Sequence, residues 1–345
     1  MSFTTWIATV FSSVSLALLT VLTLSVIFVN GWTDAPNAIS SCVATRALSP
    51  KAAVGMAAVC NFFGLIVSVS MNRTVTDTVY SMVNFGDDPN LSRIALCGGM
   101  MSVVVWALIA WYFGIPTSES HALIAGITGA AIALNGGDGV RFSVWSRVLL
   151  GLGISVLFGF GFGWMLVRFL FWIFKRSARK KSEKIFLRLE ILGGALNAFL
   201  HGSQDGQKFI GVLLLSVASA GNLTPPRTIP VWMVLLCCTV LFLGTGLGGG
   251  RIIRAVGMKM MKTESYQGVA ADFASAVSLG FCTLCGLPVS TTHVKTTALI
   301  GTGASVRIRS VNWGVARQMI LAWIFTFPGC GFLGYLTVKF LLMFL

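Results

Sequence analysis

The stretch HGSQDGQKFIG, residues 201–211, carries two full charges inside a run that is otherwise almost entirely apolar. Its polar side chains include those of His201, Gln204, Asp205 and Lys208. Of the 345 residues, 55% are hydrophobic and 10% charged, and apolar runs recur from end to end. Runs of about 20 residues cross a bilayer core. We therefore predict an all-α polytopic membrane protein, in which charged residues within spanning segments mark a functional site.

This stretch has a counterpart in the first half of the chain. NGWTDAPNAIS, residues 30–40, repeats its glycine and aspartate 171 positions earlier. A second pair of motifs, IPTSESHA (115–122) and LPVSTTHV (287–294), shares a proline, a serine and a histidine at an offset of 172 positions. Two unrelated motifs duplicated at nearly one offset predict an internal repeat. We assign residues 1–174 to a first membrane repeat, 175–188 to a basic linker and 189–345 to a second membrane repeat.

Loop charge predicts how the two repeats are oriented. Segment 175–188 holds seven basic residues and one acid and is expected in the cytoplasm, together with the basic segments 251–262 and 307–317. Segment 73–93 carries three aspartates and is expected outside. The repeats would then be inverted, with broken helices and re-entrant helical hairpins and with both termini outside, as is typical of secondary transporters. Residues 189–221 are expected to cross once as a broken helix.

Other classes of protein find little support. The net charge of +14 resides in short loops between apolar segments, which indicates topology and not nucleic-acid binding. The apolar run 6–30 lacks a basic leader and a cleavage site, so we expect a retained helix, although residues 1–50 are long for one crossing. No motif for intramembrane zinc proteolysis, a nucleophile elbow or ATP hydrolysis occurs, and we predict no enzyme, no cofactor and no structural metal.

The proline motifs predict an anion site. Proline lacks a backbone N–H, and the residue before it is biased away from helix, so the chain should break at positions 115 and 287. The hydroxyls that follow can cap new half-helices, whose N-termini carry free N–H groups and a positive dipole end. These residues are Thr117, Ser118 and Ser120 in one motif and Ser290, Thr291 and Thr292 in the other. The alternative is a kinked helix whose hydroxyls bond to their own backbone.

The acidic motifs predict a cation site. Asp34 and Asp205 lie in glycine-containing breaks, and each costs a few kcal/mol at the bilayer centre if unpaired. Carboxylates joined by backbone carbonyls suit Na+, or a proton when desolvated. Asn37, one helical turn after Asp34, offers uncharged donors and acceptors. Lys208, at the equivalent position, can neutralise Asp205 or donate to an anion.

The histidines and three further charges leave alternatives open. All three histidines, His121, His201 and His293, fall within the four motifs. They are candidate proton carriers or residues that order the hairpins. Glu119 and Lys295 either face the cavity or pair within the protein, and Asp272 is expected to mark a helix entry.

The four motifs in this order resemble the duplicated signatures of the PiT inorganic phosphate transporters, over about residues 25–305. The resemblance implies symport of inorganic phosphate across the cell membrane, driven by H+ or Na+, with metal phosphate as the cargo of some members. It also implies a homodimer and a site between inverted repeats. It assigns Asp34, Asn37 and Asp205 to ion coupling and phosphate contact. By the same resemblance, Thr117, Ser118, Ser290 and Thr291 hold phosphate.

This chain departs from the family pattern beside both aspartates. Thr33 and Gln204 replace the asparagine before each aspartate, and Lys208 replaces the final asparagine of the second copy. These positions bear on the cation, and a fixed ammonium could replace one Na+, which favours proton coupling. From the residues alone, a permease for sulfate or another tetrahedral oxyanion stays an alternative. An uncoupled anion channel and a non-transporting receptor or enzyme are weaker ones.

Overall fold

The computed structural model describes residues 2–11, 13–115, 117–220 and 228–344, and its secondary structure is helical apart from one isolated bridge. The α-helices are α1 (Phe3–Phe11), α2 (Val14–Thr33), α3 (Ser40–Ala44), α4 (Pro50–Met71), α5 (Thr74–Ser81), α6 (Pro89–Phe113), α7 (Glu119–Asn135), α8 (Phe142–Phe174), α9 (Arg179–Ala218), α10 (Val231–Gly246), α11 (Gly250–Ile253), α12 (Ser265–Leu284), α13 (Thr291–Val306) and α14 (Trp313–Leu341). The all-α prediction is confirmed.

Several helices have apolar surfaces that suit contact with lipid. Five described helical segments are long and apolar enough to cross a membrane, and α10 with its bent continuation, Gly250–Lys259, makes a sixth if the two pieces form one span. In α8, only 28% of the most apolar window is buried, and Leu157 and Trp172 are 70% and 66% exposed. Apolar side chains exposed along a whole helix are stable in hydrocarbon and not in water. The chain is therefore a polytopic membrane protein.

Both expected hairpins are present. Helices α6 and α7 form hairpin A, whose base is closed by backbone hydrogen bonds from Asn84 to Gly139 and from Arg141 to Met82. Helices α12 and α13 form hairpin B, where Asn312, just after α13, donates to the carbonyl of Met260, just before α12. Each hairpin therefore leaves at the end of the molecule where it entered. Pro116, at the expected break of hairpin A, lies outside the described residues.

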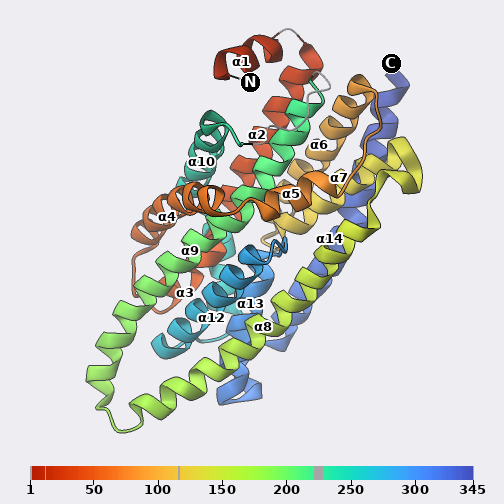
Figure 1. Cartoon of the computed structure of the whole chain (residues 1–345). Helices are drawn as coiled ribbons and strands as arrows, with labels where there is room; N and C mark the ends of the chain where they lie inside the picture. The colour runs from red at the N-terminus through yellow and green to blue at the C-terminus, as the bar shows by residue number, and fades with distance from the viewer. Residues whose placement is uncertain (1, 12, 116, 221–227, 345) are drawn as a thin grey trace.

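The two hairpins open toward opposite ends of the molecule (Figure 1). The base of hairpin A lies at the end of the molecule that holds both termini. The base of hairpin B lies at the opposite end, where the loop 175–178 also lies. This arrangement favours the inverted relation of the two halves, which stays a prediction. The basic segment 175–188 is mostly helical, because α9 already begins at Arg179.

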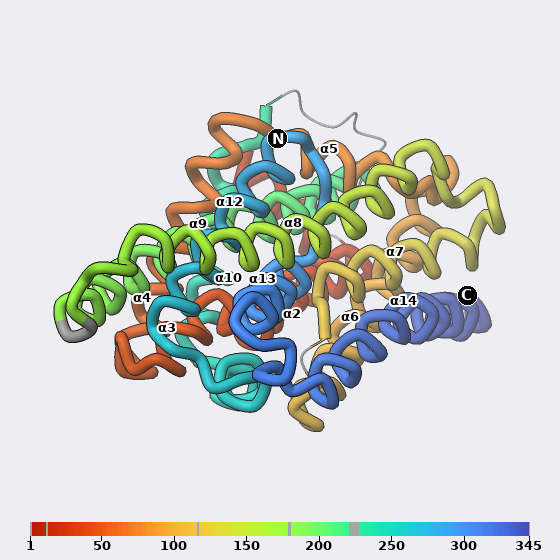
Figure 2. Tube along the Cα trace, turned by 90° about the horizontal axis from the view of Figure 1, so that it is seen from below, coloured from red at the N-terminus to blue at the C-terminus, as the bar shows by residue number. Residues whose placement is uncertain are grey.

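The halves interleave through equivalent helix pairs. Helix α8 of the first half packs on α13 and α12 of the second, and α14 of the second half packs on α7 and α6 of the first (Figure 2). Gly159 of α8 and Gly331 of α14, 172 positions apart, lie at these two contacts. A Cβ on Gly129 of α7 would overlap the Gly331 carbonyl, and one on its equivalent Gly301 of α13 would overlap the Phe160 carbonyl. Only glycine permits such close helix packing.

The two acidic motifs differ locally, contrary to expectation. Asp34 does lie at a break, where α2 ends and a 3-10 helix (Ala35–Ile39) with Pro36 at its start begins. Asp205 lies within α9, which continues for 40 residues without interruption, so the expected broken helix at 189–221 is wrong. Gly202 and Gly206 there serve close packing, since a Cβ on Gly202 would overlap the Asn61 carbonyl and one on Gly206 would lie 2.5 Å from Leu65.

The N-terminal region begins with the short helix α1, which has nine residues and is too short to cross a bilayer. It packs against α2, and the ring of Trp6 lies 4.8 Å from that of Trp232 in α10. The crossing itself is made by α2 and its continuation to Ala44.

Candidate functional site

Asp34 is held by hydroxyls from the tip of hairpin B. Its Oδ2 accepts a hydrogen bond from Thr291 at 3.3 Å, and its Oδ1 accepts one from Thr292. Asn37, one turn further along the chain, donates to Oδ1 at 2.7 Å and to the Thr292 hydroxyl at 3.1 Å. Asp34 and Asn37 are 1% and 2% exposed, so a buried acid is held by neutral donors alone. If ionised, such a carboxylate would carry a charge that these donors do not offset, which is costly to bury.

Asp205 is held by cationic and neutral donors. Lys208 donates to its Oδ1 at 2.6 Å, so the i, i+3 pairing, one of the two roles that the sequence left open for this lysine, is present. Ser120 of hairpin A donates to the same oxygen at 3.3 Å, and Asn30 of α2 donates to Oδ2 at 3.1 Å. Three elements of the fold therefore converge on one carboxylate, which is 1% exposed.

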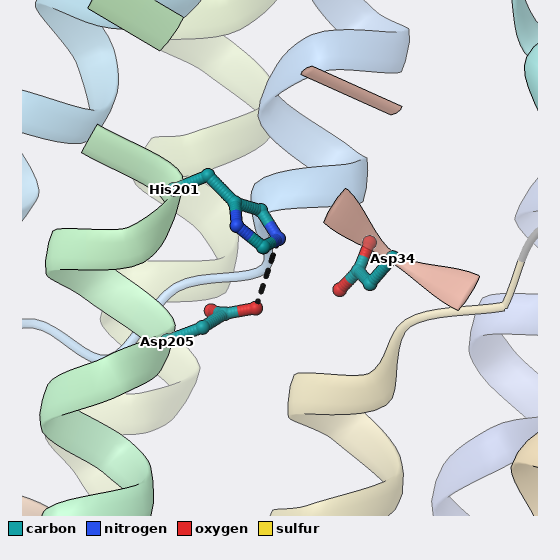
Figure 3. Close-up of side chains that lie close together, drawn as sticks. All are labelled: Asp34, His201 and Asp205. Atoms are coloured by element: carbon teal, nitrogen blue, oxygen red, sulfur yellow. Dashed lines mark ion pairs between the residues drawn. The ribbon is translucent and has the colours of Figure 1, made fainter. Parts of the chain in front are cut away.

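Asp34, His201 and Asp205 form a compact set of potential cation ligands (Figure 3). One ligand atom from each lies within 4.8 Å of the others, and all three residues are buried. His201 Nε2 lies 3.4 Å from Asp205 Oδ2, and its Nδ1 bonds the Asn61 side chain at 3.0 Å. Two carboxylates fit a hard monovalent cation or a proton, and the imidazole fits a proton better than Na+.

Lys208 connects both hairpins to Asp205. Its Nζ donates to the Ser120 hydroxyl of hairpin A at 2.6 Å and to the Val289 carbonyl of hairpin B at 2.5 Å. The side chain is 1% exposed, and its three donors are thereby used. The ammonium therefore lies where the two hairpin tips meet.

Asp34 and Asp205 are each hydrogen-bonded to the hairpin of the other half of the chain. Asp34, from the first half, bonds hairpin B of the second half, whereas Asp205, from the second half, bonds hairpin A of the first. Thr33 adds a 3.1 Å hydrogen bond to Glu119 of hairpin A, so Glu119 pairs within the protein. Gln204 donates to the Leu287 carbonyl of hairpin B at 3.0 Å. A change in the charge of either aspartate would therefore change the hydrogen bonds that it makes to the hairpin of the opposite half.

The predicted hydroxyl caps are present at both hairpin tips. Ser118 is the N-cap of α7 and accepts from the His121 N–H at 3.2 Å, and Ser290 is the N-cap of α13 and accepts from the His293 N–H at 3.2 Å. Both serines are fully buried, and Thr117 beside Ser118 is 9% exposed. Capping leaves other first-turn N–H groups without helical partners, and these can bind an anion.

His121 and His293 lie against each other where the tips meet, with ring centroids 4.2 Å apart. The rings of Phe327 and Trp323 of α14 pack on them at 4.4 Å and 3.8 Å. Among the described residues, neither imidazole has a hydrogen-bond partner. These histidines contact each other and aromatic rings, whereas His201 contacts an acid.

The structure adds residues that sequence reasoning missed or treated only as caps. Asn30 precedes Asp34 by one turn, and that spacing was the available signal. Ser120 and Thr292 bond the acids across the repeat, which no pattern within one half could show. Asp272 was expected to mark a helix entry, but it is buried and paired with Lys295.

Comparison with known proteins identifies relatives along nearly the whole chain. The profile described as "Phosphate transporter family" matches twice, at residues 30–182 and 174–334. A Bacillus subtilis protein named "Probable low-affinity inorganic phosphate transporter" is 36% identical over 320 residues, covering 92% of this chain and 94% of its own. A Rhizobium meliloti protein of the same name is 34% identical, covering 90% and 91%.

A solved structure titled "The sodium-dependent phosphate transporter" has the same fold. It superposes with a TM-score of 0.88 over 96% of this chain and 100% of its own, at 20% sequence identity. The relatives are transporters and not enzymes. With the family profile matched in both halves, the chain belongs to the phosphate transporter family.

Proposed function

We propose that this protein carries inorganic phosphate across the cell membrane by symport with a cation, H+ or Na+. The observation that carries the proposal is the meeting of two capped helix N-termini at the Lys208 ammonium, beside a buried pair of aspartates. Helix N-termini and an ammonium bind an oxyanion, and paired carboxylates bind a cation. The relatives' names supply phosphate as the oxyanion.

The proposed phosphate site lies at the hairpin tips. Its side chains are those of Asn37, Thr117, Ser118, Lys208, Ser290 and Thr291. In the structure, the hydroxyls of Ser118 and Ser290 cap their helices, and Thr291 donates to Asp34. Phosphate would therefore take the Thr291 donor from Asp34, whereas the Ser118 and Ser290 hydroxyls, which accept in their caps, would donate their own O–H to phosphate. Because such exchange replaces one hydrogen bond by another, its net cost is small.

Charge explains why the anion needs a cation. Asp34, Asp205 and Glu119 are three buried carboxylates, and Lys208 supplies one ammonium, so the fully ionised site has a formal charge of −2. Bringing a phosphate anion into this site without a counter-ion would add repulsion in a medium of low dielectric. Cations bound at Asp34 and Asp205 remove that repulsion, so binding of the two ions is mutually favourable. Thr33 and Gln204 complete the ion-coupling site.

The departures from the family pattern in this chain bear on the choice between H+ and Na+ as the coupling ion. The solved structure with the same fold is titled with the word "sodium-dependent", which supports Na+ as one candidate. Lys208 already places one fixed cation on Asp205, and His201 lies 3.4 Å from the same carboxylate. These contacts favour H+, with His121, His201 and His293 as candidate proton carriers. Metal phosphate is an alternative cargo.

We further propose that the protein is a multi-pass protein of the cell membrane, with segment 175–188 in the cytoplasm, and that it forms a homodimer. The basic residues of that segment support the orientation. Light scattering of the detergent-solubilised protein measures the oligomeric state, and a monomer would remove the homodimer.

Uptake of labelled phosphate by proteoliposomes tests the proposed function. A Na+ gradient and a pH gradient are imposed in turn, with unlabelled sulfate as competitor. We expect concentrative uptake under one gradient and weak competition by sulfate. Equal competition by sulfate would replace phosphate with a broader oxyanion substrate, and uptake under neither gradient would remove coupled transport.

A further inference from the structure

A second buried polar cluster lies outside the Asp34–Asp205 site. It consists of Cys42 of α3, Glu190 of α9, Asp272 of α12 and Lys295 of α13. All four residues are at most 1% exposed. The proposed function assigns no role to any of these four residues.

Part of this cluster is fully paired. Lys295 bonds Asp272 Oδ1, and Ser41 donates to the same oxygen at 2.7 Å. Lys295 also donates to the Ser41 hydroxyl at 2.8 Å. The thiol of Cys42 donates to the Glu190 backbone carbonyl at 3.3 Å and points to Asp272 Oδ2 at 3.9 Å. The thiol is therefore a donor in this structure, and the Asp272–Lys295 pair is neutral.

Glu190 is the member without a partner. Neither carboxylate oxygen accepts a hydrogen bond from any described residue. Thr45 lies beside it, but the Thr45 hydroxyl donates to the Ser41 carbonyl at 2.9 Å. Gly268 of α12 makes room for the carboxylate, because a Cβ there would overlap both of its oxygens. A buried, ionised carboxylate without donors is strongly unfavourable, whereas a protonated one is not.

Within the buried cluster, Lys295 is the one cation for the two carboxyl groups of Asp272 and Glu190, whereas the basic residues Arg46, Lys184 and Lys262 lie farther out at a cavity wall. Lys295 neutralises Asp272, the Cys42 thiol is neutral, and Glu183 on the same helix adds a second, exposed negative charge. We propose that Glu190 is a proton-binding site of this protein, separate from the Asp34–Asp205 site, that exchanges its proton with the solution on the side of the basic linker. Binding forms one O–H bond on a Glu190 oxygen with a proton from water, and release breaks it.

A cavity approaches Glu190 from the side of the basic linker. It has a volume of about 1030 Å³, and its walls include Thr45, Arg46, Glu183, Lys184, Lys262 and Ser265. Thr45 and Ser265 lie three positions from Cys42 and Gly268, and Glu183 lies seven positions from Glu190 on α9. These spacings are one and two turns of helix, so the cavity wall reaches within about 10 Å of Glu190 along the helix axis.

The cluster is also connected to the central site. Lys295 contacts the Ala38 carbonyl at 3.5 Å, next to Asn37 in the broken segment after α2. One turn earlier on α13, Thr292 bonds Asp34. Protonation of Glu190 changes the electrostatic potential at the Lys295 ammonium. Lys295 lies on α13, the helix whose Thr292 bonds Asp34. As part of the proposed symport, Glu190 would carry a coupling proton.

Infrared spectroscopy tests this inference without requiring transport. The purified protein in lipid vesicles is titrated with pH, and the carbonyl-stretch band of protonated carboxylic acids is recorded. We expect Glu190→Gln to lose one such component, whereas Glu183→Gln, a matched change at an exposed site on the same helix, keeps it. Glu190→Asp should keep a component at a displaced midpoint pH. An unchanged spectrum in both Glu190 variants would overturn the inference.

Transport then separates this inference from the proposed function. We expect Glu190→Gln to lose accumulation of phosphate driven by a pH gradient and to keep exchange of labelled for unlabelled phosphate. Accumulation equal to that of the unchanged protein would remove Glu190 from coupling. If the unchanged protein moves no phosphate at all, the proposed function fails, and the infrared result still decides whether Glu190 binds a proton.

Discussion

At the scale of single residues, Lys208 decides how this site handles charge. Its ammonium bonds Asp205, Ser120 of hairpin A and the Val289 carbonyl of hairpin B. A mobile cation would have to make similar contacts to occupy the same place. The side chain therefore acts as a cation that is never released, and the site needs one fewer from solution.

Removal of this ammonium should make phosphate binding more dependent on added cation. Lys208→Asn removes a charged hydrogen bond worth about 1.5 to 3 kcal/mol. We expect the apparent affinity for phosphate to fall by about tenfold to a hundredfold at low cation, with partial recovery as Na+ is raised. Half-saturation of uptake at a series of Na+ concentrations measures this. Lys339→Asn, an exposed lysine on α14, is the control, and equal behaviour of the two variants would contradict the role of Lys208.

Ser290 tests the anion site at a hairpin tip. Its hydroxyl caps α13 and is fully buried, so Ser290→Ala removes a donor and a cap together. We expect a loss of phosphate affinity of about 1.5 to 3 kcal/mol from the hydrogen bond to an anion. Ser305→Ala, near the other end of α13, removes a hydroxyl that donates to the Thr302 carbonyl, away from the hairpin tip, and should leave affinity unchanged. Direct measurement of phosphate binding compares the two, and equal affinities would remove Ser290 from the site.

The residues of the site could be predicted to different degrees. The i, i+3 pair of Asp205 and Lys208 lies on one helix, and spacing alone was sufficient. Asn30 and Glu190 could not be assigned, because their importance depends on which helices lie opposite them. Glu190 in particular lies eleven positions before His201, outside every repeated motif. Its burial results from the close approach of α12 at Gly268.

At the scale of elements, the breaks and the continuous helices have separate causes. Pro36 follows Asp34 and lacks a donor, so the chain there leaves the α-helix for a 3-10 segment. No proline lies near Asp205, and its glycines are tolerated inside α9 because neighbouring helices pack tightly on them. Glycine alone was therefore a poor predictor of a break. The break before α13 was predicted correctly, since Pro288 stands there.

The turn before α13 depends on Gly286. It has φ of 68°, and a Cβ there would lie 2.7 Å from the Thr74 Cβ. Gly286→Ala should destabilise hairpin B by about 1 to 2 kcal/mol from backbone strain alone, with a further loss from the clash. Gly280→Ala in α12 should be tolerated, because its closest neighbours would be Leu200 atoms at 3.9 Å. Thermal unfolding in detergent measures both, and equal unfolding temperatures would contradict this account of the turn.

At the scale of the whole molecule, the architecture is consistent with the predicted duplication of one unit, which stays a prediction. The family profile matches each half separately, and the equivalent contacts of α8 with α13 and of α14 with α7 use glycines one repeat apart. The all-α class and the hairpins could be predicted, because they follow from hydropathy and from the positions of the proline motifs. The interleaving of the halves could not, since it depends on which surfaces fit each other.

Labelling of cysteines introduced one at a time tests the inverted arrangement. In a Cys285→Ser background, we expect Asp138→Cys at the base of hairpin A to react with a membrane-impermeant reagent from outside the cell. Arg309→Cys at the base of hairpin B and Ser177→Cys in the loop after α8 should react from the cytoplasmic side only. All three positions are exposed. Reaction of positions 138 and 309 from the same side would contradict inversion.

The most direct test of the account is accumulation of phosphate by a protein without its two central acids. Asp34→Asn with Asp205→Asn keeps the side-chain volumes and removes the charges that are proposed to bind the cation. In proteoliposomes with an imposed gradient, we predict that the unchanged protein concentrates labelled phosphate and that the double variant does not. Concentration of phosphate by the double variant to the same level would show that the aspartates do not couple the cation to the anion.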